Sequence, residues 1–123
     1  MSICNIPISI GELYDKFSIL QIKQERIVDR EKLSFVNREI IYLQPYVDNF
    51  NLDLTIRNQI KTINEKLWDI EDKIRIKEHT QSFDDEFILL ARMVYITNDE
   101  RYKIKSLINK IFNSEIYEIK DYK

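Results

Sequence analysis

Two stripes of polar and aromatic side chains are the part of this sequence best suited to chemistry. Within each stripe the members are three or four positions apart, a spacing that places side chains on one face of a helix. The stripes consist of Asn64, Trp68, Glu71 and Arg75, and of Ala91, Tyr95, Asn98, Tyr102 and Lys105. In an antiparallel helix pair both stripes lie on the same side, so we expect them to face each other across a small hollow.

These side chains favour the binding of a small anion. Lysine and arginine bind phosphate or carboxylate, arginine through paired hydrogen bonds. The candidate cations are Lys16, Lys23, Arg26, Arg75, Arg101 and Lys105. The rings of Trp68 and Tyr95 can stack on a base or a sugar, and Asp15, Asn64, Glu71 and Asn98 complete the expected ligand site. The leading hypothesis is therefore a protein that binds, and in doing so sequesters, a nucleotide-like or phosphorylated-sugar ligand without a cofactor.

A purely structural interpretation of the same residues stays open. Trp68 and Tyr95 can be large core residues, and Glu12 with Lys16 can be an ordinary pair on one helix turn. Arg101 falls at a seam position, where it can form a buried ion pair that sets the register of the helices.

The enzymatic alternative is a magnesium-dependent nucleotide pyrophosphohydrolase. Mg²⁺ takes oxygen ligands and bridges substrate phosphates, so such an enzyme needs converging carboxylates. The carboxylates that could share one ion are Asp15, Glu71, Asp72 and Asp99. The all-α enzymes of this kind carry two acidic pairs on adjacent helices, whereas Asp15 and Asp72 belong to pairs more than fifty residues apart. We therefore favour a binding protein over an enzyme.

The composition excludes several other classes. The one glycine is at position 11, so there is no glycine-rich phosphate loop, and one cysteine with one histidine cannot make a structural zinc site. A net charge of -2 does not favour non-specific binding of nucleic acid. No apolar run reaches the roughly 18 residues of a membrane span, so we expect a cytoplasmic protein that contacts no membrane.

Hydrophobic periodicity predicts two helices in the first half of the chain. The segment Ser9-Ile10-Gly11-Glu12 matches a capping box, which places the start of a helix near Ile10. Asp29 can cap a second helix, and Pro45 should end it because proline restricts the residue before it. Residues 48–51 are then expected to form a loop.

The second half predicts two longer helices. Isoleucine and leucine recur without a break from Asp53 to Lys77, and the same rhythm continues from residue 83 to 112, with Ser82 as the cap. Residues 97–100 could instead cap a separate helix, which would break the fourth helix near Thr97.

These elements predict one all-α domain over residues 1–123. We expect an antiparallel four-helix bundle of one short and one long hairpin, with an extended N-terminal segment that lies along a C-terminal tail. The long hairpin outruns the short one by roughly 10 to 20 Å, which leaves part of its apolar seam uncovered. The protein is therefore expected to form a homodimer or, alternatively, to act as a helical interaction module.

Three segments resemble the signature blocks of a family of short helical proteins of unknown function found in bacteria and phages. The segments are residues 9–27 (SIGELYDKFSILQIKQERI), 67–75 (LWDIEDKIR) and 90–109 (LARMVYITNDERYKIKSLIN). The resemblance spans nearly the whole chain. It implies no activity. It implies only that the following residues sit within the recurring blocks: Glu12, Asp15, Lys16, Trp68, Glu71, Asp72, Tyr95, Asn98, Asp99 and Arg101.

Overall fold

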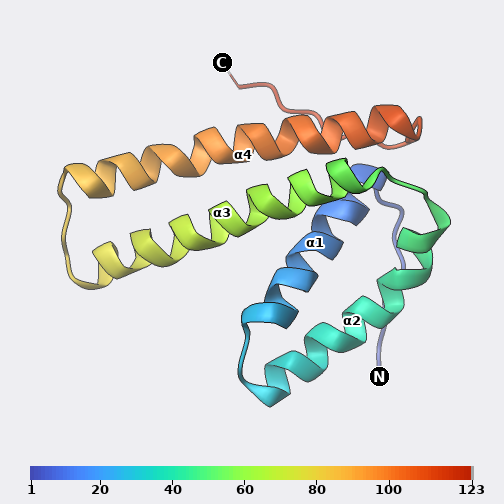
Figure 1. The fold of residues 1–123 in the computed structure, drawn as a ribbon, viewed down its shortest axis with the longest axis horizontal. Helices are drawn as coiled ribbons and strands as arrows, with labels where there is room; N and C mark the ends of the chain where they lie inside the picture. The colour runs from blue at the N-terminus through green and yellow to red at the C-terminus, as the bar shows by residue number, and fades with distance from the viewer. Residues whose placement is uncertain (123) are drawn as a thin grey trace.

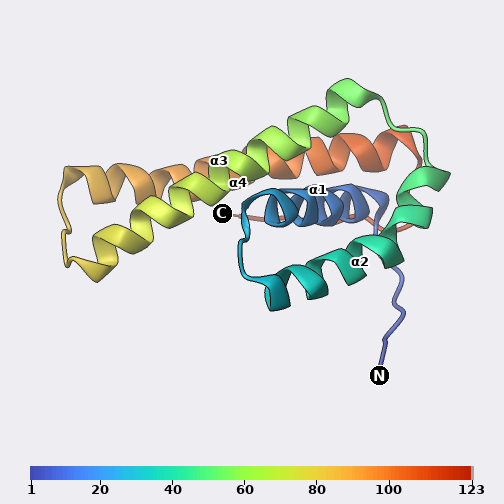
Figure 2. The same ribbon diagram turned by 60° about the horizontal axis from the view of Figure 1, so that its bottom comes forward.

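The computed structural model describes residues 1–122 and contains four helices joined by short connections (Figure 1). The helices are α1 (Ile10–Arg26), α2 (Arg30–Asn49), α3 (Leu54–His79) and α4 (Asp85–Ile111). The described residues contain no strand, so the all-α prediction is confirmed. Helices α3 and α4 run side by side in opposite directions and extend well beyond α1 (Figures 1 and 2).

Helix α1 is the centre of the packing. It contacts each of the other three helices, whereas α2 packs against α1 alone (Figure 2). The core cluster gathers where α1 begins and where α2 and α4 end, and it consists of Leu13, Tyr14, Phe17, Val47, Leu52 and Ile108. Burial of each such side chain contributes about 1.5 to 3 kcal/mol, so this cluster holds the two hairpins together.

The first turn of α1 is anchored from two directions. The Ser9 hydroxyl accepts a hydrogen bond from the Glu12 amide at 3.1 Å, as the capping pattern predicts. The Gly11 amide donates to Asn109 Oδ1 at 2.6 Å. A Cβ atom at position 11 would overlap the carbonyl oxygen of Lys105, so glycine allows α1 to approach the backbone of α4 closely.

The prediction that Pro45 ends the second helix is wrong, because α2 continues through Pro45 to Asn49. The last turn is held by Val47, which is completely buried in the core, and by the Tyr14 hydroxyl. That hydroxyl lies 2.9 Å from the Val47 carbonyl oxygen and 2.7 Å from that of Phe50, donating to this pair of oxygens. Tertiary packing therefore outweighs the lost proline hydrogen bond. Of the expected loop at residues 48–51, residues 48 and 49 are helical, and residues 50 and 51 lie after the end of the helix.

The long helices match the prediction apart from their ends. Asp84, and not Ser82, caps α4, because the Asp84 carboxylate accepts from the Phe87 amide at 3.0 Å. Ser82 instead belongs to the end of α3, where its amide donates to the Lys77 carbonyl at 2.9 Å. Helix α4 is continuous through Thr97, so the alternative of a break there is wrong.

The two terminal segments lie apart, contrary to the expectation that they would run together. Arg38 of α2 donates to the Met1 sulfur at 3.4 Å, which brings the N-terminal segment to α2. The C-terminal tail instead returns along α4, where the Tyr102 hydroxyl donates to the Glu118 carbonyl at 3.1 Å. None of the helices in the described part of the chain is long and apolar enough to cross a membrane.

Candidate functional site

A buried carboxylate lies at the junction of α1, α3 and α4. The side chain of Asp15 is 1% exposed. Arg101 of α4 donates to both of its oxygens, from Nε at 2.8 Å and from Nη2 at 2.5 Å. Asn64 of α3 donates to Asp15 Oδ1 at 2.9 Å and to the Ser18 hydroxyl at 2.8 Å. One carboxylate therefore ties three helices together.

Lys105, one turn after Arg101, extends this network to the C-terminal tail. Its buried ammonium lies 2.7 Å from a carboxylate oxygen of Glu12 and 2.7 Å from one of Glu118. Asp15 Oδ2 is 3.8 Å away. The network thus contains two cations and three carboxylates, all of them on α1, α4 and the tail.

The contacts of this network shift the pKa of both cations. Burial lowers the pKa of the Lys105 ammonium, but hydrogen bonds to Glu118 and Glu12 outweigh burial and raise that pKa above its ordinary value. The hydrogen bonds from Arg101 to Asp15 raise the pKa of the guanidinium, against the opposing effect of burial. Both side chains are therefore fully charged at neutral pH.

A hollow of about 190 Å³ opens beside the buried pair. It lies between α1, α3 and α4, and its lining consists of Ile19, Asn64, Leu67, Trp68, Glu71, Asn98 and Arg101. The amide oxygen of Asn98 accepts from Arg101 Nη1 at 3.3 Å. In the described part of the chain, these contacts account for three of the five N–H groups of Arg101. Arg101 itself is part of the lining of the hollow.

A charged side chain of α3, Glu71, lines the same hollow, whereas Arg75 and Arg26 are not part of its lining. Glu71 is paired with Arg75, which lies one turn further on and is largely exposed. The guanidinium of Arg26, from α1, lies 5.7 Å from the centre of the Trp68 ring and pairs with Asp69 at 2.7 Å. The indole is therefore held in place by a cation–π contact at the edge of the hollow.

Other residues predicted for the ligand site lie outside the hollow. Tyr95 is 56% exposed and is absent from its lining. Lys16 pairs with Glu39 of α2 at 3.1 Å, and Lys23 is partly buried on α1 without reaching the lining. Asp15 holds Arg101, and Lys105 pairs with Asp15 at 3.8 Å, but neither Asp15 nor Lys105 is part of the lining. The antiparallel stripes thus converge at Asn64, Trp68, Glu71 and Asn98, and diverge toward the free end of the hairpin.

The four carboxylates considered for magnesium do not form a donor set. Asp15 is engaged by Arg101 and Asn64, whereas Asp72 and Asp99 are exposed. In residues 1–122 no group of three or more acidic, histidine or cysteine side chains is arranged to hold a metal ion. The magnesium alternative stays a prediction that no observed arrangement favours.

Sequence reasoning missed four residues of this region. Ile19 and Leu67 supply the apolar part of the lining, and Ser18 and Glu118 complete the hydrogen bonds of the network. Ile19 lies four residues after Asp15 on the same helix face, a spacing that could have pointed to it. Glu118 carried no periodic signal, because the tail has no regular structure.

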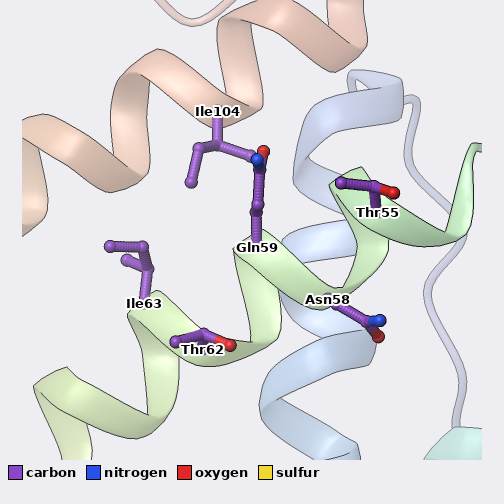
Figure 3. A pocket seen from close by; sticks show the side chains of 6 residues that line it. All are labelled: Thr55, Asn58, Gln59, Thr62, Ile63 and Ile104. Atoms are coloured by element: carbon purple, nitrogen blue, oxygen red, sulfur yellow. The ribbon is translucent and has the colours of Figure 1, made fainter.

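A larger depression, of about 470 Å³, lies elsewhere between α3 and α4 (Figure 3). Its lining is uncharged and consists of Thr55, Asn58, Gln59, Thr62, Ile63 and Ile104. In Figure 3 Gln59 points from α3 toward α4, whereas Asn58 points away. This depression offers no charged group to an anion, so we place the candidate site at the smaller hollow.

Comparison with known proteins identifies the family. The model of the "Family of unknown function (DUF6165)" matches residues 4–123. The chain belongs to this family. It is also similar to a threonine--tRNA ligase of Borrelia garinii subsp. bavariensis, with 34% identity over 106 residues, which are 85% of this chain and 17% of the ligase. The chain thus spans about a sixth of that relative. No solved structure matches the chain.

Proposed function

We propose that this member of the DUF6165 family binds a small anionic molecule with hydroxyl groups in the hollow beside Arg101. Phosphorylated sugars and nucleotides are the candidate classes. The observation that carries the proposal is the position of Arg101, which Asp15 holds in place and which is part of the lining of the hollow.

An anionic group is the partner that suits Arg101. A guanidinium binds phosphate or carboxylate with directed hydrogen bonds, and a side chain already held in place loses little conformational entropy when the anion arrives. The neighbouring amides of Asn98 and Asn64 add neutral hydrogen-bonding groups to the same wall. Arg101 is the cation among the residues that line the hollow, so Arg101 is the anchor.

Glu71 and Trp68 favour hydroxyl groups and a sugar ring as the rest of the ligand. A carboxylate accepts hydrogen bonds from hydroxyls but repels a second anionic group, and an indole offers an apolar face to a sugar or a base. With Arg101 on one side and Glu71 on another, the hollow suits a molecule that has an anionic end and a hydroxyl-bearing end.

The size of the hollow limits how much of such a ligand it can enclose. Pockets for complete drug-sized ligands range from about 300 to 1,000 Å³, whereas this hollow measures about 190 Å³. A phosphorylated sugar fits this scale better than a complete nucleotide, whose base would extend past Trp68. The likeness to a threonine--tRNA ligase does not extend the proposal to tRNA, because the chain spans 17% of that enzyme and carries a net charge of -2.

Calorimetric titration tests the proposal with a panel of sugar phosphates, nucleoside monophosphates and the corresponding unphosphorylated compounds. We expect saturable binding of at least one phosphorylated compound and much weaker binding of its unphosphorylated form. Glu71→Gln, which keeps the shape of the lining, should weaken binding by about tenfold, equivalent to the loss of one hydrogen bond of about 1.4 kcal/mol.

Asp72→Asn is the matched control for Glu71→Gln. It makes the same change in charge at the next position of α3, on an exposed side chain that does not line the hollow. The proposal is supported if the affinity for the ligand is unchanged in Asp72→Asn and lower in Glu71→Gln. Equal effects of the two variants, or no binding across the panel, would overturn it.

A further inference from the structure

The outward face of α2 carries aromatic side chains that are largely exposed, and the N-terminal segment reaches the same helix at Arg38 through the Met1 sulfur. Phe35 is 60% exposed and Tyr42 is 54% exposed, and Tyr46 continues the same helix face. The guanidinium of Arg38 lies 5.4 Å from the centre of the Phe35 ring, within the same stripe. Exposed aromatic and arginine side chains in one stripe are typical of protein interfaces.

The fold leaves this face open because α2 contacts α1 alone among the helices. In Figure 2 α2 lies at the border of the molecule, away from α3 and α4. Val28, in the turn just before α2, is 89% exposed and extends the apolar surface beyond the start of the helix. Ile3 and Ile6 of the N-terminal segment are also exposed.

The charges beside the stripe indicate what covers it. Glu31 and Arg38 lie on one flank, seven residues apart, and Lys32 and Glu39 lie on the other flank, also seven residues apart. Each flank thus carries one negative charge four residues from Phe35 and one positive charge three residues from Phe35 on its other side.

A second copy of α2, packed antiparallel about a two-fold axis at Phe35, would match this pattern. Such an axis places each flank against the same flank of the other copy. Glu31 then meets Arg38 of the second copy, and the two Phe35 rings face each other. Lys32 meets Glu39, whose carboxylate also pairs with Lys16 of its own chain at 3.1 Å. A parallel arrangement would align residues of equal number and would also bring opposite charges together, Glu31 with Lys32 and Arg38 with Glu39. The flanks therefore favour a second copy of α2, and exchanging the charges of Glu31 and Arg38 distinguishes the two directions, because the exchange restores attraction in the antiparallel dimer alone.

We infer that the chain forms an antiparallel homodimer through the outward face of α2, centred on Phe35. This inference is independent of the proposed ligand. The stripe from Phe35 to Tyr46 is about 17 Å long at 1.5 Å per residue. A dimer through this stripe would therefore be held by one contact between two helices. The dimer should therefore be at the small end of specific interfaces and should dissociate on dilution.

Sedimentation equilibrium of the full chain over a concentration series tests this inference. We expect a reversible monomer–dimer equilibrium that Phe35→Glu abolishes. Ile88→Glu is the matched control, since Ile88 is similarly exposed but lies in the first turn of α4. A chain that stays monomeric at every concentration, or a dimer lost in Ile88→Glu and kept in Phe35→Glu, would overturn the inference.

A charge exchange tests the antiparallel register. Arg38→Glu and Glu31→Arg each replace two attractive contacts of the dimer by repulsive ones, so each should weaken dimerisation by about tenfold or more. The double variant restores opposite charges and should recover most of the original affinity. Single variants without effect, or a double variant as weak as the single ones, would contradict the register, and circular dichroism verifies that all variants stay helical.

Discussion

Asp15 and Arg101 are 86 residues apart in the sequence, and two hydrogen bonds of 2.8 and 2.5 Å join the carboxylate of one to the guanidinium of the other. The carboxylate is buried, and Asn64 donates to it from a third helix at 2.9 Å. The pair therefore fixes the positions of α1 and α4 and orients the guanidinium that borders the hollow. Stability and the proposed binding depend on the same contact.

Arg101→Met should strongly destabilise the fold. Removing one partner of a buried ion pair leaves the other charge uncompensated, which costs about 3 to 5 kcal/mol. The free energy of unfolding in urea measures the loss. Arg75→Met is the control, because its pair with Glu71 is largely exposed and should contribute less than about 1 kcal/mol.

The double variant Asp15→Leu with Arg101→Met separates the cost of an unpaired charge from the value of the pair. Replacing both charges by apolar side chains should recover most of the stability lost in Arg101→Met, since no buried charge is then left alone. A double variant that is less stable than Arg101→Met would show that the pair itself, and not the unpaired carboxylate, accounts for the loss.

Gly11→Ala should destabilise the protein by about 1 to 3 kcal/mol, the usual cost of forcing atoms into a packed site. The added methyl group would overlap the Lys105 carbonyl oxygen and lie 2.9 Å from Asn109 Oδ1. In an exposed helix, replacing glycine by alanine stabilises the folded protein by up to about 1 kcal/mol. The sign of the change in stability therefore distinguishes a close contact at Gly11 from an exposed position. Thermal unfolding measures it, with Gln24→Ala at an exposed site of α1 as the control. A more stable Gly11→Ala protein would refute the close crossing of α1 and α4.

Gln81→Gly should stabilise the protein by about 0.5 to 1 kcal/mol. Gln81 lies two residues after the last residue of α3 and has a φ of 55°. Glycine adopts this left-handed conformation without the steric cost of a side chain. Urea unfolding measures the gain, and Gln81→Ala, which keeps a Cβ atom, should show none. Equal stability of the glycine and alanine variants would contradict this account of the turn.

The fold could be predicted from the sequence to a greater extent than the site. The apolar repeats that contain Ile60, Leu67 and Leu90 determine where helices form, and these local patterns are visible in one sequence. Pro45 misled the prediction because the burial of Val47, a tertiary effect, keeps the last turn of α2 helical. The cap of α4 was misplaced because Ser82 and Asp84 are both good caps, and only their contacts distinguish them.

For the site, helical spacing predicted that Asn64, Trp68, Glu71 and Asn98 lie near one another, and all four line the hollow, the first three from α3 and Asn98 from α4. It misplaced Tyr95, because matching two stripes by register does not account for how far the hairpin extends beyond α1. The seam position of Arg101 indicated a buried ion pair, but not that Asp15 is its partner. A contact between residues so distant in the chain has no signature in a single sequence.

Stability should fall in alkaline solution in a way that depends on Lys105. Burial lowers the pKa of its ammonium, but the hydrogen bonds to Glu118 and Glu12 outweigh burial and raise that pKa above 10.5. The folded protein thus holds this proton more tightly than the unfolded chain. The resulting stabilisation is complete below about pH 10.5 and is lost as the pH rises through the folded pKa.

Glu118→Gln tests this dependence, because it removes one of the contacts that raise the pKa of Lys105. The decrease in the free energy of unfolding between about pH 10 and pH 12 should become shallower than in the unchanged protein. Glu115→Gln, at an exposed position of the same tail, is the control. Burial also raises the pKa of the Tyr14 phenol. Its effect on the pH dependence of stability is the same in all three proteins, so it cancels when they are compared. Identical pH profiles would contradict the link between the tail and Lys105.

Trp68 is the one tryptophan of the chain and lines the hollow, so its fluorescence reports directly on whether a ligand enters there. Titration with the phosphorylated compound that binds best by calorimetry should change the emission of Trp68 saturably, at the same midpoint as the heat of binding. The change should be much weaker in Asn98→Ala, at the opposite wall. Calorimetric binding that leaves the emission unchanged, or an emission change that Asn98→Ala does not affect, would place the ligand elsewhere and contradict the proposed site.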